Sequence, residues 1–394
     1  DSVTGVAILG CTGSIGTQSL DVLSALRDRF RVVGLAAGRN LSLFQRQIDA
    51  WQPALVACER EADRVAVRSG TAHWATLEEI ATHPEVAIVI VATIGKIGLA
   101  PALAALRAGK AVALANKEAL IMAGGLLREA AAAGGGELRP VDSEHSAIWQ
   151  CLWGERPEDV RRLILTASGG AFRDRPLDEL RTVTPEQALR HPTWQMGRKI
   201  TVDCATLFNK GLEAIEAHIL FDVPLDRVAI VMHRESIVHS LVEFTDGALK
   251  AQLGLPDMRL PIQLALTYPE RLPVHGAAPL DLAAAGALHF EPLDMERLPC
   301  LRLALDAGAR GGAYPAVLAA ADEIAVASFL DGQIRFTEIA GVIEATLGAF
   351  SARSTGADTA DLDTILAADG WARAHASRQI GALAELAESR SLAL

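Results

Sequence analysis

The stretch Val6-Ala-Ile-Leu-Gly10-Cys-Thr-Gly13-Ser-Ile-Gly16 joins a short apolar run to a glycine-rich turn. The apolar run predicts a buried strand, and a helix is expected to begin near Thr17. Glycines three residues apart let the backbone turn sharply and approach a pyrophosphate, whose charge a helix N-terminus favours. An ordinary strand-to-helix turn is the alternative, but the position directly after a first strand favours a dinucleotide-binding loop.

Short β-branched runs continue to alternate with alanine- and leucine-rich segments up to Pro140. They predict further buried parallel strands at residues 32–35, 87–91 and 111–114. This alternation is typical of an α/β fold, with a Rossmann-like, doubly wound parallel sheet over residues 1–141. Mixed strands and helices predict an α+β domain at 142–273, which contains most of the candidate catalytic clusters described below. A proline-containing connecting segment at 274–299 and a C-terminal helical domain at 300–394 are expected to follow.

The end of the second predicted strand distinguishes NADP from NAD. An NAD site usually has an acidic residue there for the ribose hydroxyl, whereas Leu35-Ala-Ala-Gly38 is followed by Arg39 and Asn40. An arginine can hold the 2′-phosphate of NADP, so NADP is the favoured cofactor. The alternative is that Arg39 is a solvated loop residue.

Composition excludes several classes of protein. The 394 residues are 50% hydrophobic and 22% charged, which predicts two or three soluble globular domains. The formal charge of -11 argues against a general nucleic-acid binder, whose affinity depends on neutralising phosphates. No apolar run has the length of a membrane helix and no signal peptide is recognisable. A bacterial cytoplasm is the expected location, with a plastid stroma after transit-peptide removal as the alternative.

The cysteines Cys11, Cys58, Cys151, Cys204 and Cys300 are scattered without C-x-x-C spacing. They therefore signal neither a zinc site nor a disulfide framework, and they favour a reducing compartment.

The run Val141-Asp-Ser-Glu-His-Ser-Ala-Ile148 sets two carboxylates two residues apart. If this run ends a strand, Asp142 and Glu144 point to the same side, because strand side chains alternate. Two hard oxygen ligands on one face suit a divalent cation such as Mg²⁺ or Mn²⁺. Solvated acids and helix caps are more common, so the metal hypothesis depends on the clusters that accompany the pair.

Two of these clusters follow predicted strands. Ala115-Asn-Lys-Glu118 places a cation and an amide near the sheet edge where ligands bind in open α/β folds, although a lone lysine there is more often surface charge. Ser168-Gly-Gly170 combines a hydroxyl with two small residues, which suits close backbone contact with an anion. An ordinary turn is the alternative for this second cluster.

Two more clusters lie farther along the chain. His191-Pro-Thr-Trp-Gln-Met-Gly-Arg-Lys199 combines a rigid proline, a large aromatic and a glycine, which are features of a lid that closes over a ligand. Burial of Trp194 and Met196 in the core is the alternative. Asn209 and Glu213 fall one turn apart on a predicted helix, where they offer an amide and a third carboxylate unless that face is merely solvated. Three carboxylates would leave positions on a metal open to substrate oxygens.

The motifs G-C-T-G-S-I-G, A-N-K-E, P-V-D-S-E-H, S-G-G, H-P-T-W-Q-M-G-R-K and N-K-G-L-E, in this order and spacing, resemble those of 1-deoxy-D-xylulose-5-phosphate reductoisomerase. The likeness extends to about Glu270 and resumes at Pro315-Ala-Val-Leu-Ala-Ala-Ala-Asp-Glu323, which is similar to the family's P-A-V-L-N-A-A-N-E helix. The resemblance implies an NADP-dependent oxidoreductase of isoprenoid biosynthesis and a homodimer. Such an enzyme rearranges the carbon skeleton of deoxyxylulose phosphate and reduces the resulting aldehyde to 2-C-methyl-D-erythritol 4-phosphate.

The resemblance also implies roles for individual residues. Contacts to NADPH would come from Thr12, Gly13, Ser14, Ile15, Gly38, Arg39, Asn40, Asn116, Glu118 and Gly197. The divalent cation (Mg²⁺, Mn²⁺ or Co²⁺) would be bound by Asp142, Glu144 and Glu213. The sugar phosphate would contact Lys117, Ser143, Glu144, Ser168, His191, Trp194, Cys204, Asn209, Lys210 and Glu213. The catalytic group would be Lys117, Asp142, Glu144, His145 and Glu213, with His145 close to the metal and the reacting carbons.

The residue types fit this chemistry. A metal that chelates a ketone and its neighbouring hydroxyl polarises the carbonyl, Lys117 can add positive charge there, and NADPH then delivers hydride. A closing lid would keep water from the reactive intermediate.

The sequence departs from the family pattern at three places. Cys204 stands where the family usually has a serine, and a thiol is a weaker hydrogen-bond partner than a hydroxyl. Arg39 stands where the family often has a lysine, and His233-Arg-Glu-Ser236 replaces the usual H-P-Q-S.

Two other functions are compatible with parts of the sequence. A different NADP-dependent dehydrogenase, for example one acting on a semialdehyde, would make the acidic residues structural. A non-catalytic NADP-binding sensor would use Cys204 or Cys11 to respond to redox state.

Overall fold

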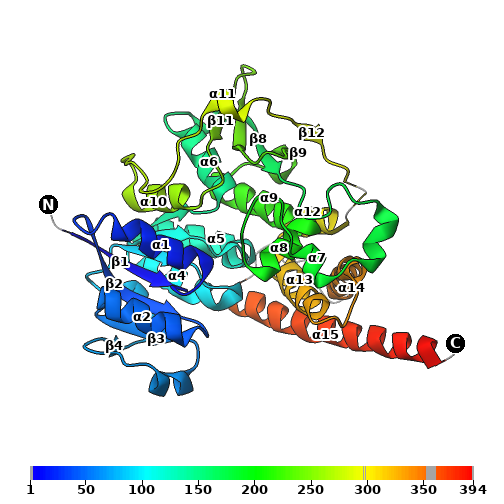
Figure 1. Ribbon diagram of the computed structural model, residues 1–394, viewed down its shortest axis with the longest axis horizontal. Coiled ribbons are helices and arrows are strands. Elements are labelled where there is room, and N and C mark those ends of the chain that lie inside the picture. The colour runs from blue at the N-terminus through cyan, green and yellow to red at the C-terminus, as the bar shows by residue number, and fades with distance from the viewer. Residues whose placement is uncertain (1–2, 296, 298, 352–360, 393–394) are drawn as a thin grey trace. The chain divides into compact units, whose positions relative to one another are not determined.

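The computed structural model describes residues 3–295, 297, 299–351 and 361–392 (Figure 1). The chain divides into two compact units. Unit 1 comprises Asp1–Leu120, Gly124–Gln150 and Asp257–Leu280, and unit 2 comprises Ile121–Ala123, Cys151–Pro256 and Asp281–Leu394. The boundaries of the three domains and the connecting segment expected from the sequence stay a prediction.

Unit 1 is built on a seven-stranded sheet in which every neighbouring pair is parallel. From edge to edge the strands are β4 (His73–Trp74), β3 (Leu55–Cys58), β2 (Phe30–Ala37), β1 (Thr4–Leu9), β5 (Ile88–Val91), β6 (Ala111–Leu114) and β7 (Glu137–Pro140). All four predicted strands are confirmed. The chain builds outward from β1 to β4 and then returns to β5 on the other side of β1. This reversal confirms the doubly wound fold and creates a switch point at the carboxyl ends of β1 and β5.

The helices of unit 1 are α1 (Ser14–Ser24), α2 (Leu41–Trp51), α3 (Leu77–Thr82), α4 (Leu99–Arg107), α5 (Lys117–Gly134), α6 (Ser143–Leu152) and α10 (Arg259–Thr267), of which α5 and α6 extend beyond the bounds of the unit. One core cluster joins Ile8 of β1, Leu23 of α1, Phe44 of α2 and Ile262 of α10. Helix α10 therefore packs with the parallel sheet, although it follows the strands of unit 2 in the sequence.

The acidic run does not continue a strand, so that part of the prediction is wrong. Strand β7 ends at Pro140, and α6 begins at Ser143. The carbonyl oxygen of Asp142 accepts the amide of Ser146 at 2.8 Å, and its Oδ1 accepts the amide of Ser143 at 3.0 Å. Asp142 and Glu144 are thus placed by the first turn of a helix, where carboxylates are favoured by the helix dipole. Helix α1 likewise begins earlier than expected, at Ser14.

Unit 2 contains a mixed five-stranded sheet in the order β11 (Leu249–Leu253), β10 (Val238–Phe244), β8 (Val160–Ala167), β9 (Val228–Met232) and β12 (Glu291–Pro292). Strands β8 and β9 are parallel, whereas the other pairs are antiparallel. Its helices are α7 (Pro185–Ala188), α8 (Arg198–Ala205), α9 (Phe208–Phe221), α11 (Leu282–Ala285), α12 (Pro299–Arg310), α13 (Tyr314–Leu330), α14 (Ile339–Ser351) and α15 (Leu362–Leu392).

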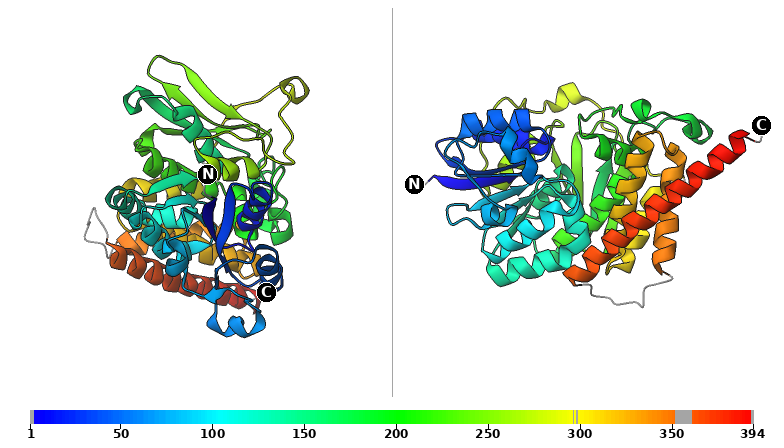
Figure 2. Two further views of the ribbon diagram at one scale, coloured as in Figure 1. Left: turned by 90° about the vertical axis from the view of Figure 1, so that its left-hand side faces the viewer. Right: turned by 90° about the horizontal axis from the view of Figure 1, so that it is seen from below.

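The C-terminal helices pack closely because their facing residues are small. Helix α15 lies beside α13 and α14 (Figure 2). A Cβ added at Gly211 of α9 would lie 2.4 Å from Cβ of Ala304 on α12. The helical character predicted for residues 300–394 is confirmed where the structure describes them, and its parts at 352–360 and 393–394 lie outside the described residues. Among the described residues, no helix combines the length and the apolarity needed to cross a membrane.

Candidate active site

The glycine-rich loop after β1 lies at the switch point of the parallel sheet. Gly10 has a φ of 94°, and a Cβ there would lie 2.4 Å from the carbonyl oxygen of Ala92, which follows β5. A Cβ on Gly16 would lie 2.2 Å from the carbonyl oxygen of Gly10. Both positions require glycine. Gly13 is the N-terminal capping residue of α1, and with Ser14 it is exposed, while Thr12 and Ile15 are half-buried. The loop presents a helix N-terminus that suits a pyrophosphate.

The end of β2 provides an exposed guanidinium group. The side chain of Arg39 is 82% exposed, and its Nε lies 3.7 Å from Glu59 Oε2, a distance that holds it only loosely. Asn40 caps α2 by accepting the amide of Leu43 at 3.2 Å, and Gly38 is half-buried. Arg39 is therefore able to turn toward an added phosphate.

Asn116 and Lys117 are buried at the start of α5. Asn116 Nδ2 donates to Thr93 Oγ1 at 3.0 Å and to the carbonyl of Gly95 at 2.8 Å, so it ties the loops after β5 and β6 together. Lys117 Nζ lies 2.8 Å from Asp142 Oδ2. With 9% of its surface exposed, Lys117 is not the solvated surface charge that its sequence position alone would favour.

The carboxylates at the start of α6 are half-buried and ordered by close partners. Ser143 Oγ donates to Glu144 Oε2 at 2.6 Å. His145 is fully buried, with Nδ1 at 3.7 Å from Asp142 Oδ2. Carboxylate oxygens are hard ligands of the kind that Mg²⁺ and Mn²⁺ prefer, so Asp142 and Glu144 fit a divalent cation.

In unit 2 a third carboxylate is buried on α9. Glu213 is 2% exposed, and its Oε1 accepts a hydrogen bond from Asn209 Nδ2 at 2.5 Å while Oε2 pairs with Lys210 Nζ. The predicted pairing of Asn209 with Glu213, one turn apart, is confirmed. The alternative, that this helix face is merely solvated, is wrong. A charged group this deeply buried requires compensation, which Lys210 supplies.

Ser168 and His191 contact each other at the end of β8. His191 Nδ1 accepts the backbone amides of Trp194 at 2.9 Å and Thr193 at 3.2 Å. In the neutral ring the proton is therefore on Nε2, which donates to Ser168 Oγ at 3.0 Å. With His191 donating to its oxygen, the Ser168 hydroxyl can direct its own hydrogen toward an anionic group.

The expected lid, residues 191–199, is a loop that leads into α8. Trp194 and Met196 are half-buried and Gly197 is exposed. The Trp194 ring lies 6.3 Å from the ring of His239, and Thr193 Oγ1 lies 3.3 Å from Ser236 Oγ. The sequence did not lead us to Ser236 and His239 as candidates. The one signal that could have found them is their position, as a hydroxyl and an imidazole in or just after the turn 233–236 that departs from the family pattern.

Comparison with known proteins decides the family. The family model described as 1-deoxy-D-xylulose 5-phosphate reductoisomerase matches residues 6–124, and the models of its C-terminal domains match residues 138–221 and 253–375. The reductoisomerase of Thermomicrobium roseum is 52% identical over 383 residues, which cover 96% of this chain and 98% of that protein. The chain belongs to the 1-deoxy-D-xylulose 5-phosphate reductoisomerase family. The family predicted from the motifs is thereby confirmed, and with it the prediction of an NADP-dependent oxidoreductase.

Other reductoisomerases match at similar length. The protein of Geobacillus kaustophilus is 53% identical over 349 residues, covering 87% of this chain and 91% of that protein. The reductoisomerase of Zymomonas mobilis in complex with NADPH has a TM-score of 0.87 at 41% identity, covering 96% of this chain and 99% of that one. A reductoisomerase structure in complex with NADPH, fosmidomycin and magnesium has a TM-score of 0.89 at 36% identity, covering 97% and 99%. These likenesses agree with the parallel sheet, the mixed sheet and the C-terminal helices described above.

The S-G-G loop of this reductoisomerase chain needs glycine at its last position. Gly170 has a φ of 69°, and a Cβ there would lie 2.4 Å from the carbonyl oxygen of Cys204. We expect Gly170→Ala to lower the free energy of unfolding by about 3 kcal/mol, from left-handed strain plus a clash with backbone. Gly154→Ala is the matched control, because Gly154 has a φ of 78° and open space around it. Its cost in a urea titration should be about 1 kcal/mol, and equal losses for both variants would contradict the clash.

Burial keeps the His191 imidazole of this reductoisomerase chain neutral. Desolvation first, and then the charges of Arg173 and Lys210, lower the pKa of His191 from 6.5 to about 4. Because the folded state binds fewer protons than the unfolded state between these values, stability is complete above pH 6.5 and falls as the pH drops toward 4. We expect urea titrations to show a loss on the order of 1–2 kcal/mol between pH 7 and pH 4.5 that is missing in His191→Gln, after allowance for solvent screening. His73→Gln, which removes an exposed histidine, should keep the wild-type pH dependence.

Proposed function

We propose that this chain catalyses the NADPH- and divalent-metal-dependent isomerisation and reduction of 1-deoxy-D-xylulose 5-phosphate to 2-C-methyl-D-erythritol 4-phosphate, a step toward isoprenoid precursors. The observation that carries this proposal is the family match over 96% of the chain. The buried Lys117 and Glu213, each with a close partner of opposite charge, support it because such groups are rare away from functional sites.

We propose Asp142, Glu144 and Glu213 as the ligands of the divalent cation. When bound, the cation would polarise the ketone and its neighbouring hydroxyl. Lys117 adds positive charge beside Asp142, where negative charge develops on the substrate oxygen as the carbon skeleton rearranges. His145 is fully buried, and its Nδ1 lies 3.7 Å from Oδ2 of Asp142, the same oxygen that Lys117 contacts.

We propose that the sugar phosphate is bound by the hydroxyl, imidazole, amide and ammonium groups already described. They are Ser143, Ser168, His191, Cys204, Asn209 and Lys210, with Trp194 covering the substrate from the lid loop. Cys204 is half-buried in α8, and its thiol would donate a weaker hydrogen bond than the family's serine.

We propose that NADPH occupies the switch point of the parallel sheet. The residues that would contact it are Thr12, Gly13, Ser14, Ile15, Gly38, Arg39, Asn40, Asn116, Glu118 and Gly197. NADPH would supply the hydride, and the loop after β1 would hold its pyrophosphate at the N-terminus of α1. The exposed Arg39 would meet the 2′-phosphate.

Location and assembly are further parts of the proposal. The similar proteins come from bacteria such as Thermomicrobium roseum and Geobacillus kaustophilus, which supports a bacterial cytoplasm. We also propose that the protein forms a homodimer, and the support for this is the sequence resemblance to the family.

The decisive experiment is an assay of NADPH oxidation with deoxyxylulose phosphate, with Mg²⁺, with Mn²⁺ and after complete chelation of metal. We expect turnover that needs both the sugar phosphate and a cation. Activity that survives chelation would favour a different NADP-dependent dehydrogenase. Absence of turnover in every metal would overturn the proposal.

A further inference from the structure

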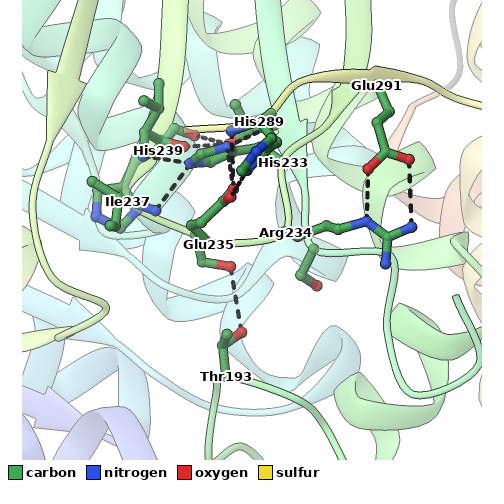
Figure 3. A network of polar contacts seen from close by, with 12 residues as sticks. Thr193, His233, Arg234, Glu235, Ile237, His239, His289 and Glu291 are labelled. Carbon is green, nitrogen blue, oxygen red and sulfur yellow. Dashed lines mark hydrogen bonds and ion pairs between the residues drawn. The ribbon is translucent and has the colours of Figure 1, made fainter. Parts of the chain in front are cut away.

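The turn between β9 and β10, residues 233–236, carries two charged residues where the family pattern has H-P-Q-S (Figure 3). Arg234 Nε lies 2.7 Å from Glu291 Oε1, and Arg234 Nη1 lies 2.7 Å from Asp174 Oδ1. Glu291 opens β12, and Asp174 follows the S-G-G loop. One guanidinium group therefore joins three segments that are far apart in the sequence.

The neighbouring residue, Glu235, joins the turn to residue 289 as well. Glu235 Oε1 lies 2.5 Å from His289 Nδ1, and its Oε2 lies 3.1 Å from His233 Nδ1 and accepts the amide of His289 at 3.3 Å. Figure 3 shows Glu235 reaching both imidazoles. Burial opposes ionisation, but the hydrogen bonds from His289 and the nearby His233 leave the pKa of Glu235 below its usual value. Glu235 is therefore a charged anchor at neutral pH.

His233 fixes the turn from within. Its ring is buried, and Nε2 accepts the amides of Ile237 at 3.2 Å and Val238 at 3.1 Å. Nδ1 donates to the carbonyl of His289 at 2.8 Å, and the ring stacks on Phe290 at 4.7 Å. Residues 289–291 are thus attached to the turn by hydrogen bonds, ion pairs and a stacked ring.

On its opposite side the turn contacts segments that carry the groups proposed to bind the substrate. Ser236 has a φ of 54°, a left-handed conformation that a non-glycine residue keeps only when its surroundings hold it. Its hydroxyl lies 3.3 Å from that of Thr193 in the lid loop. Arg173 Nη1 donates to the carbonyl of Ser168 at 3.0 Å and to that of Arg234 at 3.4 Å. The turn therefore contacts both the lid loop and the Ser168 loop.

We propose that Arg234 and Glu235 are positioning residues, which anchor the turn to residues 289–291 so that the lid loop and Ser168 are held ready for the sugar phosphate. This inference rests on the proposed function. A purely stabilising role is a poorer account, because the pairs of Arg234 are partly exposed and such pairs add little to stability. The contacts of the turn point to geometry at the substrate site.

The test compares Arg234→Ala, Glu235→Ala and Glu235→Gln with Arg302→Ala, a control that removes another exposed arginine of unit 2, paired with Asp306 and Glu344. Both anchor-to-alanine variants should raise KM for the sugar phosphate about tenfold without changing KM for NADPH, because small misplacements of binding groups are costly. Glu235→Gln should recover most of the loss, since glutamine still accepts the amide of His289. Arg302→Ala should match the wild type.

An activity-independent measurement separates this inference from the proposed function. Trypsin cleavage after Arg190 and Arg198, which are exposed at the two ends of the lid loop, should be faster in the two alanine variants than in the wild type. If the alanine variants were cleaved faster but the wild type showed no turnover, the proposed function would be wrong and the anchoring role would still be supported. Unchanged sugar-phosphate KM and unchanged cleavage in folded Arg234→Ala and Glu235→Ala would overturn the inference, as would a lower melting temperature alone.

Discussion

Glu213→Gln is expected to remove metal-dependent turnover while leaving NADPH binding intact. The substitution keeps the shape of the side chain and an oxygen that can accept the hydrogen bond from Asn209 Nδ2. It removes the negative charge that would bind the cation and that now compensates Lys210 Nζ. Because the carboxylate is 2% exposed, no solvent can take over either role.

The expected decrease in kcat is about a thousandfold or more, which corresponds to about 4 kcal/mol of transition-state stabilisation. The buried Lys210 left without its anion should also lower the free energy of unfolding by about 3 kcal/mol. Steady-state assays over a Mg²⁺ titration measure the first effect, and urea titrations measure the second. NADPH fluorescence on binding should be unchanged, since the proposed nucleotide residues other than Gly197 belong to unit 1, whereas Glu213 belongs to unit 2.

Asp226→Asn is the control for this substitution, because it makes the same acid-to-amide change at an exposed position of unit 2. It should leave kcat, metal dependence and stability as in the wild type. If Glu213→Gln retained wild-type turnover at saturating Mg²⁺, Glu213 would not be a metal ligand. The carboxylate would then serve only to hold Lys210.

The parallel sheet was predictable because its central strands are buried on both faces. Val6–Leu9 of β1 and Ile88–Val91 of β5 are continuous apolar runs, which the sequence displays directly. The two-residue β12 offers no such run, and its pairing with β9 depends on residues far away in the chain. Helix α10 joins unit 1 through Ile262 for the same non-local reason.

The acidic run shows how a correct set of residues can be paired with a wrong local structure. Proline at position 140 ends the short β7, and an aspartate directly before a helical pattern is a helix-start signal that the D-S-E-H run contains. Alternation along a strand is therefore not what directs Asp142 and Glu144. The chemistry of the run was readable because it depends on residue types, whereas its geometry depends on where the strand stops.

Residues that act through distant partners were the hardest to find. Ser236 and His239 look like core residues at the start of β10, since both are buried. Their closeness to Thr193 and Trp194 results from the packing of the lid loop, which no local pattern encodes. Lys117 is the opposite case, because the family resemblance implied a role that its sequence position alone did not favour, and the structure adds a buried ion pair with Asp142.

Lys117→Met is expected to lower kcat by about two to three orders of magnitude without weakening Mg²⁺ binding. Methionine keeps the length and the apolar stem of lysine in a site that is 9% exposed, but it removes the positive charge. Loss of a charge placed where an oxyanion develops costs about 3–4 kcal/mol of transition-state stabilisation. Lys117 Nζ lies 2.8 Å from Oδ2 of Asp142, so in the variant a cation would not have to compete with the ammonium group for that carboxylate.

The two roles of Lys117 therefore predict opposite changes in two measurements. A Mg²⁺ titration of Lys117→Met should give an affinity equal to or tighter than that of the wild type, while kcat at saturating Mg²⁺ falls. Lys110→Met is the control, because Lys110 is another partly buried lysine of unit 1 and its Nζ donates to the backbone carbonyl of His83 at 3.2 Å rather than to a carboxylate. If Mg²⁺ affinity fell in step with kcat, Lys117 would act by ordering the carboxylates, and its charge would have no separate part in the reaction. A decrease in kcat alone would show that the ammonium group acts on the reacting oxygens. A positive charge that repels a neighbouring cation in the ground state is favourable only where new negative charge forms in the transition state.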